Sequence, residues 1–228
     1  GAMSFRHFSE IEQRALSRHS EASVKARLTK PKSTAELLQI PAPQWLSEAS
    51  RAVFQSGFRW QVVDDKWPRF EQVFGGFNLA YCRQLSDEQL EAMMKEDGLI
   101  KHWSKTRSIQ SNADYLAGLE AQYGSVAAFF AAWQPEDICA NIATLQKSGA
   151  RLGGKTGQLW LRRMGVDMPI YSNDVLAALK LEGVTNSMPG SAKARATVQQ
   201  AFDQWRADSG RSLNEISQLL ALSVAGGN

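Results

Sequence analysis

The chain has 228 residues, of which 43% are hydrophobic and 21% are charged. This composition excludes a largely disordered protein, and the length suits one large domain or two small lobes. The 26 Lys and Arg residues against 23 Asp and Glu residues leave a net charge of only +3. A surface for nucleic acid would therefore have to come from local clustering of basic residues.

The two cysteines, Cys82 and Cys139, exclude a disulfide scaffold and a cysteine-rich zinc module. No apolar run reaches the roughly 18–20 residues that span a bilayer. We therefore expect a monomer in the reducing bacterial cytoplasm or nucleoid, with no membrane contact.

Helical periodicity dominates the chain, and alternating β-branched runs are nearly absent, so the predicted fold class is all-α. Residues 1–3 are typical of a cloning scar, 4–30 of an N-terminal helical arm, 31–43 of a proline-containing connector, and 44–222 of one helical domain. Residues 223–228 are expected to form a flexible tail. The helices predicted within the domain are Ser47–Phe54, a helix capped by Ser86, Ile109–Tyr123, Val126–Trp133, Pro135–Lys147, Lys155–Met164, Val175–Leu181, a helix carrying Val198, Phe202 and Trp205, and Leu213–Leu222.

Two of these helices are joined by a glycine-containing hairpin at residues 148–156. Glycines let the backbone approach a polyanion, and the first N–H groups of the following helix can bind an anion. Basic residues surround the turn. We predict that a DNA phosphate binds here, the alternative being an ordinary helix cap among solvated lysines. The predicted phosphate-binding residues are Arg151, Gly153, Gly154, Lys155 and Thr156.

Three stretches between Pro43 and Leu181 resemble, in their order and spacing, the 3-methyladenine DNA glycosylase I family of the helix–hairpin–helix glycosylases. They are Phe54–Trp60 followed by Lys66 and Phe70, Gly98–Lys105 followed by Asn112 and Ala113, and Gly149–Thr156 followed by Asn173 and Asp174. The resemblance implies a helical bundle with a DNA-binding hairpin, and excision of a flipped-out alkylated purine.

The sequence departs from the family at several positions. The family's base-reading glutamate falls on Ala52, and its zinc ligands fall on Val175 and Leu179. We therefore predict no structural zinc, with the N-terminal arm and the C-terminal helices stabilising that region instead. A monovalent cation bound by hairpin carbonyls is the one cofactor that the wider superfamily suggests.

The resemblance also implies site residues. Trp60 is predicted to stack on the base, with Phe54 and Phe58 beside it and Gln55 bonding to the base edge. Asp174 is the predicted catalytic carboxylate, the alternative being a helix cap; the superfamily register instead places Ser172 in the catalytic position.

A second basic group and a pair of acids complete the candidates. Lys101 and Lys105 share a helix face and are predicted to grip DNA, the alternative being a solvated face. Asp64 and Asp65 are interpreted as an exposed charged turn rather than a paired-acid site.

The predicted function is monofunctional hydrolysis of the N-glycosidic bond of alkylated purines such as 3-methyladenine in double-stranded DNA. A cationic alkylated purine leaves as a neutral base, so the enzyme need not protonate it. One carboxylate or ordered dipoles then suffice to stabilise the oxocarbenium-like sugar and admit a water. Two alternatives stay open: a non-catalytic protein that binds damaged or abasic DNA, and a helical interaction domain unrelated to DNA.

Overall fold

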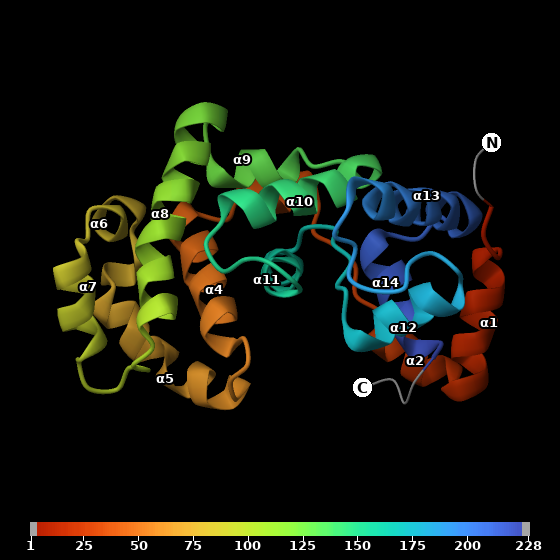
Figure 1. The fold of residues 1–228 in the computed structure, drawn as a ribbon, viewed down its shortest axis with the longest axis horizontal. Helices are drawn as coiled ribbons and strands as arrows, with labels where there is room; N and C mark the ends of the chain where they lie inside the picture. The colour runs from red at the N-terminus through yellow and green to blue at the C-terminus, as the bar shows by residue number, and fades with distance from the viewer. Residues whose placement is uncertain (1–3, 225–228) are drawn as a thin grey trace. The chain divides into compact units, whose positions relative to one another are not determined.

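The computed structural model describes residues 4–224, so the predicted cloning scar and the tail residues 225–228 lie outside the described residues. Every regular element between residues 4 and 224 is a helix, which confirms the all-α prediction (Figure 1). The α-helices are α1 (Phe8–Arg18), α2 (Glu21–Arg27), α3 (Thr34–Leu38), α4 (Ala42–Gln55), α5 (Trp60–Val73), α6 (Leu79–Arg83), α7 (Asp87–Met94), α8 (Trp103–Tyr123), α9 (Val126–Ala131), α10 (Ile138–Ser148), α11 (Thr156–Met164), α12 (Asn173–Leu181), α13 (Ala192–Ser209) and α14 (Leu213–Leu222), and two 3₁₀ turns are η1 (Gly75–Phe77) and η2 (Pro135–Asp137).

Local capping accounts for several helix starts. Ser86 and Ser212 each form a capping box, with Gln89 and Glu215 respectively as the third helical residue. Ser125 accepts a hydrogen bond from the backbone of Ala128 at the start of α9. These side chains satisfy N–H groups that have no partner within the helix, so the predicted starts are confirmed.

The predicted charged turn at Asp64 and Asp65 is wrong, because both residues lie in α5. The buried face of α5 consists of Val63, Trp67 and Phe70, which recur at helical spacing. Charged residues between these positions, and Pro68 inside the helix, obscure the pattern in the sequence. The predicted connector also contains a short helix, α3, whose start is capped by Ser33 and Glu36.

The chain divides into two compact units that do not follow the predicted order of arm, connector and domain. Unit 1 consists of the described parts of Gly1–Lys32 and Gly165–Asn228 together with Trp133–Ala143. Unit 2 consists of Ser33–Ala132 and Thr144–Met164. The predicted arm therefore belongs to the same unit as the C-terminal helices.

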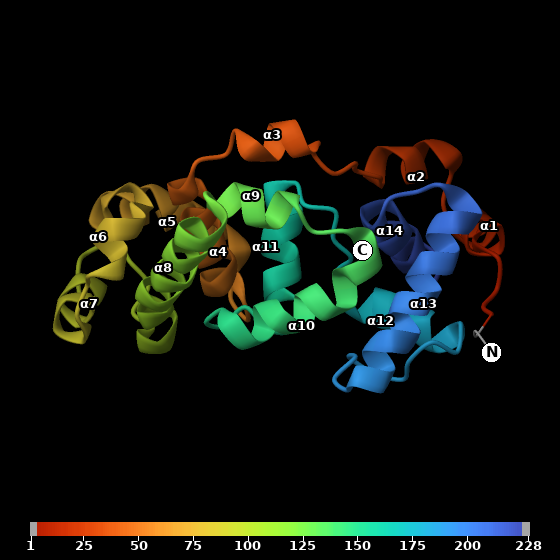
Figure 2. The same ribbon diagram turned by 90° about the horizontal axis from the view of Figure 1, so that it is seen from above.

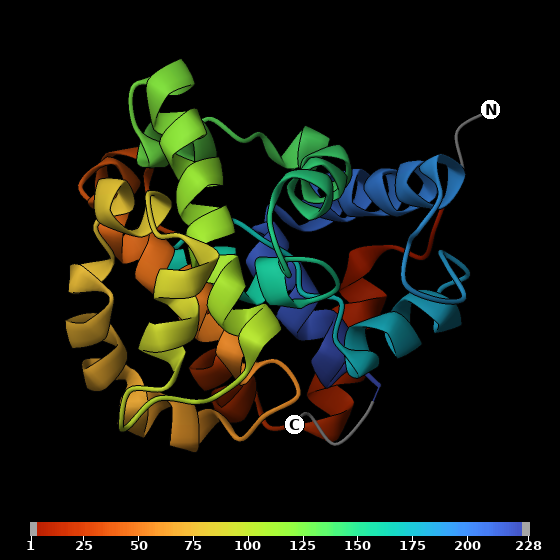
Figure 3. The same ribbon diagram turned by 60° about the vertical axis from the view of Figure 1, so that its left-hand side comes forward.

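Unit 2 is built around α4, which packs against α5, α8 and α11. In Figures 1 and 3, α8 runs alongside α4, and α6 and α7 lie on its other side. One end of the core is an aromatic cluster in which the Trp45 ring stacks on Phe130 and meets Trp160 edge-on. These large buried rings fix the relative positions of α4, α9 and α11.

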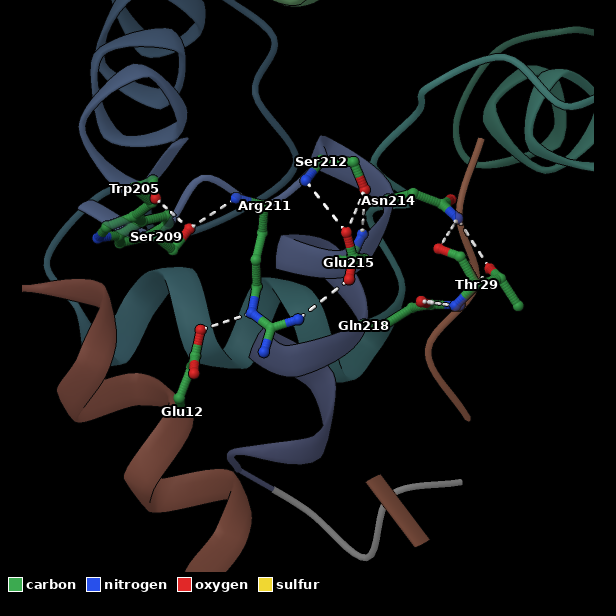
Figure 4. Close-up of polar contacts among 9 residues, drawn as sticks. All are labelled: Glu12, Thr29, Trp205, Ser209, Arg211, Ser212, Asn214, Glu215 and Gln218. Carbon is green, nitrogen blue, oxygen red and sulfur yellow. Dashed lines mark hydrogen bonds and ion pairs between the residues drawn. The ribbon is translucent and has the colours of Figure 1, made fainter. Parts of the chain in front are cut away.

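Unit 1 is built around α14, which packs against α1, α12 and α13 (Figure 2). Phe8 and Ile11 of α1 are fully buried there, as is Trp205 of α13. Figure 4 shows the polar contacts at the same place: Arg211 bonds to Glu12 of α1 and Glu215 of α14. The N-terminal arm is therefore an integral layer of unit 1.

None of the helices described between residues 4 and 224 is both long and apolar enough to cross a lipid bilayer.

Candidate functional site

Unit 2 contains a cavity of about 530 Å³ at the junction of the α4 C-terminus, the α5 N-terminus and the α11 N-terminus. Two aromatic residues of its wall, Phe58 and Trp60, are 45% and 52% exposed. The wall consists of Ala52, Gln55, Ser56, Gly57, Phe58, Arg59, Trp60, Val62, Lys155, Thr156 and Leu159. Partly exposed rings beside buried polar groups are typical of a ligand site.

The loop between α4 and α5 forms one side of this cavity. Gly57 has φ of +67°, a left-handed conformation that favours glycine and ends α4. The buried ammonium of Lys105 donates to the carbonyls of Phe54, at 3.1 Å, and Ser56, at 2.7 Å. Lys105 of α8 therefore holds the loop that carries Phe58 and leads to Trp60 at the start of α5.

This environment also perturbs Lys105. Burial, and secondarily the positive charge of Arg151, lower the pKa of the Lys105 ammonium. The same ammonium lies 5.7 Å from the centroid of the Phe58 ring, within cation–π range. The predicted role of Lys105 in gripping DNA is wrong, because its ammonium is committed to backbone carbonyls inside the protein.

Phe54 also differs from its prediction. Its side chain is fully buried and packs against Phe70, with ring centroids 4.8 Å apart, and against Trp67. It does not contribute to the cavity wall. Phe54 is a core residue because it lies on the face of α4 that packs against α5, so the prediction of base contact was wrong.

Gln55 is 1% exposed and its amide has charged partners at both ends. The amide nitrogen Nε2 donates to Asp64 Oδ1 at 2.8 Å, and the amide oxygen Oε1 accepts from Arg163 Nη1 at 2.6 Å. Asp64 also accepts from Arg51 at 2.7 Å, and Arg51 bonds to Glu48. The structure thus places the predicted base-reading amide in the wall, within a network of four charged groups.

Arg163 links this network to the predicted stacking residue. Its guanidinium carbon lies 4.7 Å from the centroid of the Trp60 ring, a cation–π contact. Burial and the charge of Arg51 lower the pKa of Arg163. Sequence reasoning missed Arg163; its spacing of four from Leu159 on α11, one helical turn, was the available signal.

The hairpin (residues 148–156) forms the other side of the cavity through Lys155 and Thr156. Asn112 of α8 clamps it with two hydrogen bonds to the backbone of Ala150, at 2.8 and 3.0 Å. Arg151 bonds to Ser104 at 2.7 Å. The turn residues Gly153 and Gly154 are exposed, with the φ of Gly154 at +57°.

Asp174 lies in unit 1, in the first turn of α12. The cap of this helix is Ser172, whose hydroxyl accepts from the backbone of Val175 at 3.2 Å. The capping role considered for Asp174 therefore belongs to Ser172, and the catalytic role of Asp174 stays a prediction. Lys101 is exposed and lies outside the cavity wall, and its contact with DNA likewise stays a prediction.

Ala52 lies in the cavity wall with 1% exposure. The carboxylate that the family pattern would supply is thus replaced by a methyl group at the cavity surface. Two carboxylates flank this position, Glu48 one turn earlier on α4 and Asp64 on α5, and both are paired with Arg51. The two acidic groups beside Ala52 are thus joined in one network through Arg51.

Within residues 4–224, no group of three or more His, Cys, Asp or Glu side chains is placed to hold a metal ion. Both cysteines are buried, and burial raises the pKa of Cys82 to about 12 and of Cys139 to about 11. Val175 and Leu179, at the positions of the family's zinc ligands, belong to the apolar core of unit 1. The predicted absence of zinc stays a prediction.

Comparison with known sequences gives one family. The family model for methyladenine glycosylase matches residues 50–152, a segment that includes the C-terminal end of α4, the Ser56–Arg59 loop, α5, α8 and the first part of the hairpin. No curated protein matches the sequence.

Comparison with solved structures gives helical DNA glycosylases. The 3-methyladenine DNA glycosylase I of Staphylococcus aureus is 15% identical, covering 73% of this chain and 92% of its own, with a TM-score of 0.51. The 8-oxoguanine DNA glycosylase of Methanocaldococcus jannaschii is 16% identical, covering 93% of this chain and 92% of its own, with a TM-score of 0.52. The 8-oxoguanine glycosylase/lyase of that organism, in complex with a 15mer DNA containing 8-oxoguanine, is 13% identical over 94% of this chain and 95% of its own, with a TM-score of 0.51. At these identities the likeness establishes the fold.

Proposed function

We propose that this protein is a DNA glycosylase that excises alkylated purines such as 3-methyladenine, because the family model for methyladenine glycosylase matches residues 50–152. One observation carries the proposal: a half-exposed tryptophan, a buried glutamine amide and a lysine share the wall of one cavity. A purine needs an aromatic surface, a polar edge contact and a nearby phosphate contact, and this cavity offers all three.

The hairpin is the proposed contact to the DNA backbone. Gly153 and Gly154 are exposed, and an added Cβ at either would meet nothing within 4 Å, so the turn is open to a ligand. Lys155 and the start of α11 add positive charge and helix-terminal N–H groups. Because Lys155 and Thr156 also line the cavity, a phosphate held here would lie beside the flipped nucleotide.

The chemistry demanded of the protein is modest for a cationic base. An N3-alkylated purine departs as a neutral molecule, so the enzyme chiefly stabilises the oxocarbenium-like sugar and admits water. Trp60 would hold the base and Gln55 would bond to its edge, while the catalytic role of Asp174 stays a prediction. We propose that the protein acts as a cytoplasmic monomer on double-stranded DNA.

The test is release of bases from methylated DNA, resolved by chromatography. We expect the wild type to release 3-methyladenine and Trp60→Ala to lower kcat/KM by about 10–100-fold, since stacking contributes about 1–3 kcal/mol per base. Tyr123→Ala is the matched control, because Tyr123 is 47% exposed and lies outside the cavity wall. Asp174→Asn tests the carboxylate in the same assay.

A wild type that releases no base would contradict the proposal. Tight, salt-sensitive binding to an abasic duplex under those conditions would instead support the non-catalytic DNA-binding alternative. Lys155→Glu would weaken DNA binding by a glycosylase and by a non-catalytic DNA-binding protein. In a protein unrelated to DNA, the same substitution would leave the activity unchanged.

Lys155 also favours a second candidate activity, that of a glycosylase/lyase. A primary amine in the wall of a base-binding cavity is a nucleophile available to the sugar. In such a step Nζ bonds to C1′ as the base leaves with the bonding pair, and the nitrogen loses a proton. The C1′–O4′ bond then breaks with O4′ taking up a proton, which leaves a ring-opened iminium ion. Loss of a 2′ proton then expels the 3′ phosphate and breaks the strand.

Strand cleavage distinguishes the two activities. For the monofunctional enzyme that we favour, borohydride traps no protein–DNA adduct, and strands break only after alkaline treatment of the abasic product. A trapped adduct that disappears in Lys155→Gln would establish the lyase instead.

A further inference from the structure

The Gln55 amide is held in one orientation by the chemistry of its two partners. Arg163, at its oxygen, can only donate hydrogen bonds, and the carboxylate of Asp64, at its nitrogen, can only accept them. Rotating the amide by 180° would place N–H groups against a guanidinium and a carbonyl against a carboxylate. Both charge-assisted hydrogen bonds would then be lost, so the flipped orientation is strongly disfavoured.

Both partners are themselves held in place. Asp64 accepts from Arg51 at 2.7 Å, and Arg51 bonds to Glu48 at 2.6 Å. Arg163 lies over the Trp60 ring. The two carboxylates and two guanidiniums balance in charge, so the network adds no net charge to the cavity wall.

A fixed amide presents its donor and its acceptor in a fixed order. A 6-aminopurine offers an amino donor at position 6 and an acceptor at N1, whereas a 6-oxopurine offers an acceptor at position 6 and a donor at N1. The two edges therefore require opposite orientations of the same glutamine. An amide that flipped freely could form hydrogen bonds with both kinds of base edge, whereas a locked amide can form them with only one.

We propose that Asp64 and Arg163 are positioning residues that lock Gln55 and thereby make the cavity discriminate 6-aminopurine from 6-oxopurine lesions. The inference rests on the proposed function and deepens it. It assigns base selection to a clamp of three residues on α4, α5 and α11, at a site where Ala52 supplies no carboxylate.

The experiment uses methylated DNA, which contains 3-methyladenine and 7-methylguanine, one base of each class. We measure kcat/KM for release of each base by the wild type, Asp64→Asn, Arg163→Gln and the double variant. Asn has the same shape as Asp, and Gln is a shorter, uncharged replacement for Arg. Both introduced amides can donate and accept hydrogen bonds, so the Gln55 amide is free to flip.

We expect the wild type to prefer 3-methyladenine by at least about tenfold, since a mispaired buried polar group costs about that much or more. The double variant should bring the ratio of the two kcat/KM values close to one, chiefly by lowering KM for 7-methylguanine. Each single variant should give an intermediate ratio.

Two controls isolate the orientation of the amide. Arg163→Lys keeps a group that only donates and should retain the preference. Asp65→Asn alters a carboxylate that accepts from Gln61 on the exposed side of the same helix, and should leave the ratio unchanged.

The outcomes separate the two proposals. A wild type that releases neither base overturns the proposed function. A wild type that releases 3-methyladenine, with the same ratio in Asp64→Asn, Arg163→Gln and the double variant, overturns the clamp alone. Circular dichroism of each variant confirms folding, and the single variants decide the question if the double variant is unfolded.

Discussion

Exposed rings and buried polar side chains meet within a few residues at the cavity of unit 2. Trp60 and Phe58 are about half exposed, whereas Gln55 and Lys105 are almost completely buried. Burying such polar groups is favourable only when each is hydrogen-bonded, and here both are. The cost of burying Gln55 and Lys105 is therefore offset by hydrogen bonds that also fix the shape of the cavity.

Lys105→Met should destabilise the protein by about 2–4 kcal/mol, because the carbonyls of Phe54 and Ser56 would lose their buried donor. Denaturant unfolding measures this loss. The control is Lys101→Met, which removes an exposed lysine just before the start of α8 and should change the free energy of unfolding by less than about 0.5 kcal/mol. Equal effects of the two substitutions would show that the Lys105 ammonium does not support the loop.

The two thiols predict a loss of stability at alkaline pH. Burial raises the pKa of Cys82 to about 12 and of Cys139 to about 11, against 9.0 for the free thiol. Above pH 9 the unfolded chain has released these protons and the folded chain has not, so the free energy of unfolding falls as pH rises toward 11.

Denaturant unfolding at pH 8 and pH 10.5 checks this, and we expect a fall of roughly 1–2 kcal/mol per thiol. The double variant Cys82→Ala/Cys139→Ala should show a smaller fall between the same two pH values. Identical slopes in the two proteins would assign the alkaline effect to other groups.

At the scale of elements, the contacts that the hairpin makes with α11 and α8 determine its position. Gly157, at the start of α11, is buried, and a Cβ there would meet the carbonyl oxygen of Leu152 at 2.4 Å. Asn112 holds the same hairpin to α8 through the backbone of Ala150. Backbone packing on one side and a two-bond clamp on the other thus position the turn rigidly.

Gly157→Ala should destabilise the protein by about 1–3 kcal/mol, because the backbone of the hairpin must move to accommodate the methyl group. Thermal unfolding measures the change. Gly153→Ala is the matched control, since its Cβ would meet nothing within 4 Å and no large change is expected. A neutral Gly157→Ala would mean that the hairpin is not held against α11 as closely as described.

On the scale of the whole molecule, the chain ends meet in one unit. α1 buries Phe8, Ile11 and Ala15 within unit 1, where it packs against α13 and α14. Arg211 and Asn214 add polar contacts to Glu12 and Thr29 (Figure 4). Contacts between residues so distant in sequence link the N-terminal arm to the folding of the C-terminal helices.

A chain lacking residues 4–30 should therefore expose the apolar face of α14, bind a hydrophobic dye and unfold at a lower temperature. A milder change is Ile11→Ala, which should lower the free energy of unfolding by about 2–5 kcal/mol because Ile11 is fully buried. Leu16→Ala, 40% exposed on the same helix, is the control and should cost much less. An unchanged melting temperature in the truncated chain would show that the arm does not support unit 1.

The sequence by itself determined what depends on neighbours along the chain. Ser86 and Ser212 mark helix starts because a cap acts over three residues, and the same local periodicity established the all-α class. The family motifs identified Trp60 and Gln55 as cavity residues and Lys155 as a hairpin residue, and the structure brings all three into one wall.

Only the tertiary structure decided the contacts made across helices. Phe54 and Lys105 were predicted to face ligand and DNA, but burial between α4, α5 and α8 makes them structural. Asp64 and Arg163 lie 9 and 108 residues from Gln55 in sequence, and they meet it because three helices pack together. The hydrogen-bond partners of a buried polar group depend on which side chains from other helices surround it. Periodicity along one helix carries no information about those neighbours.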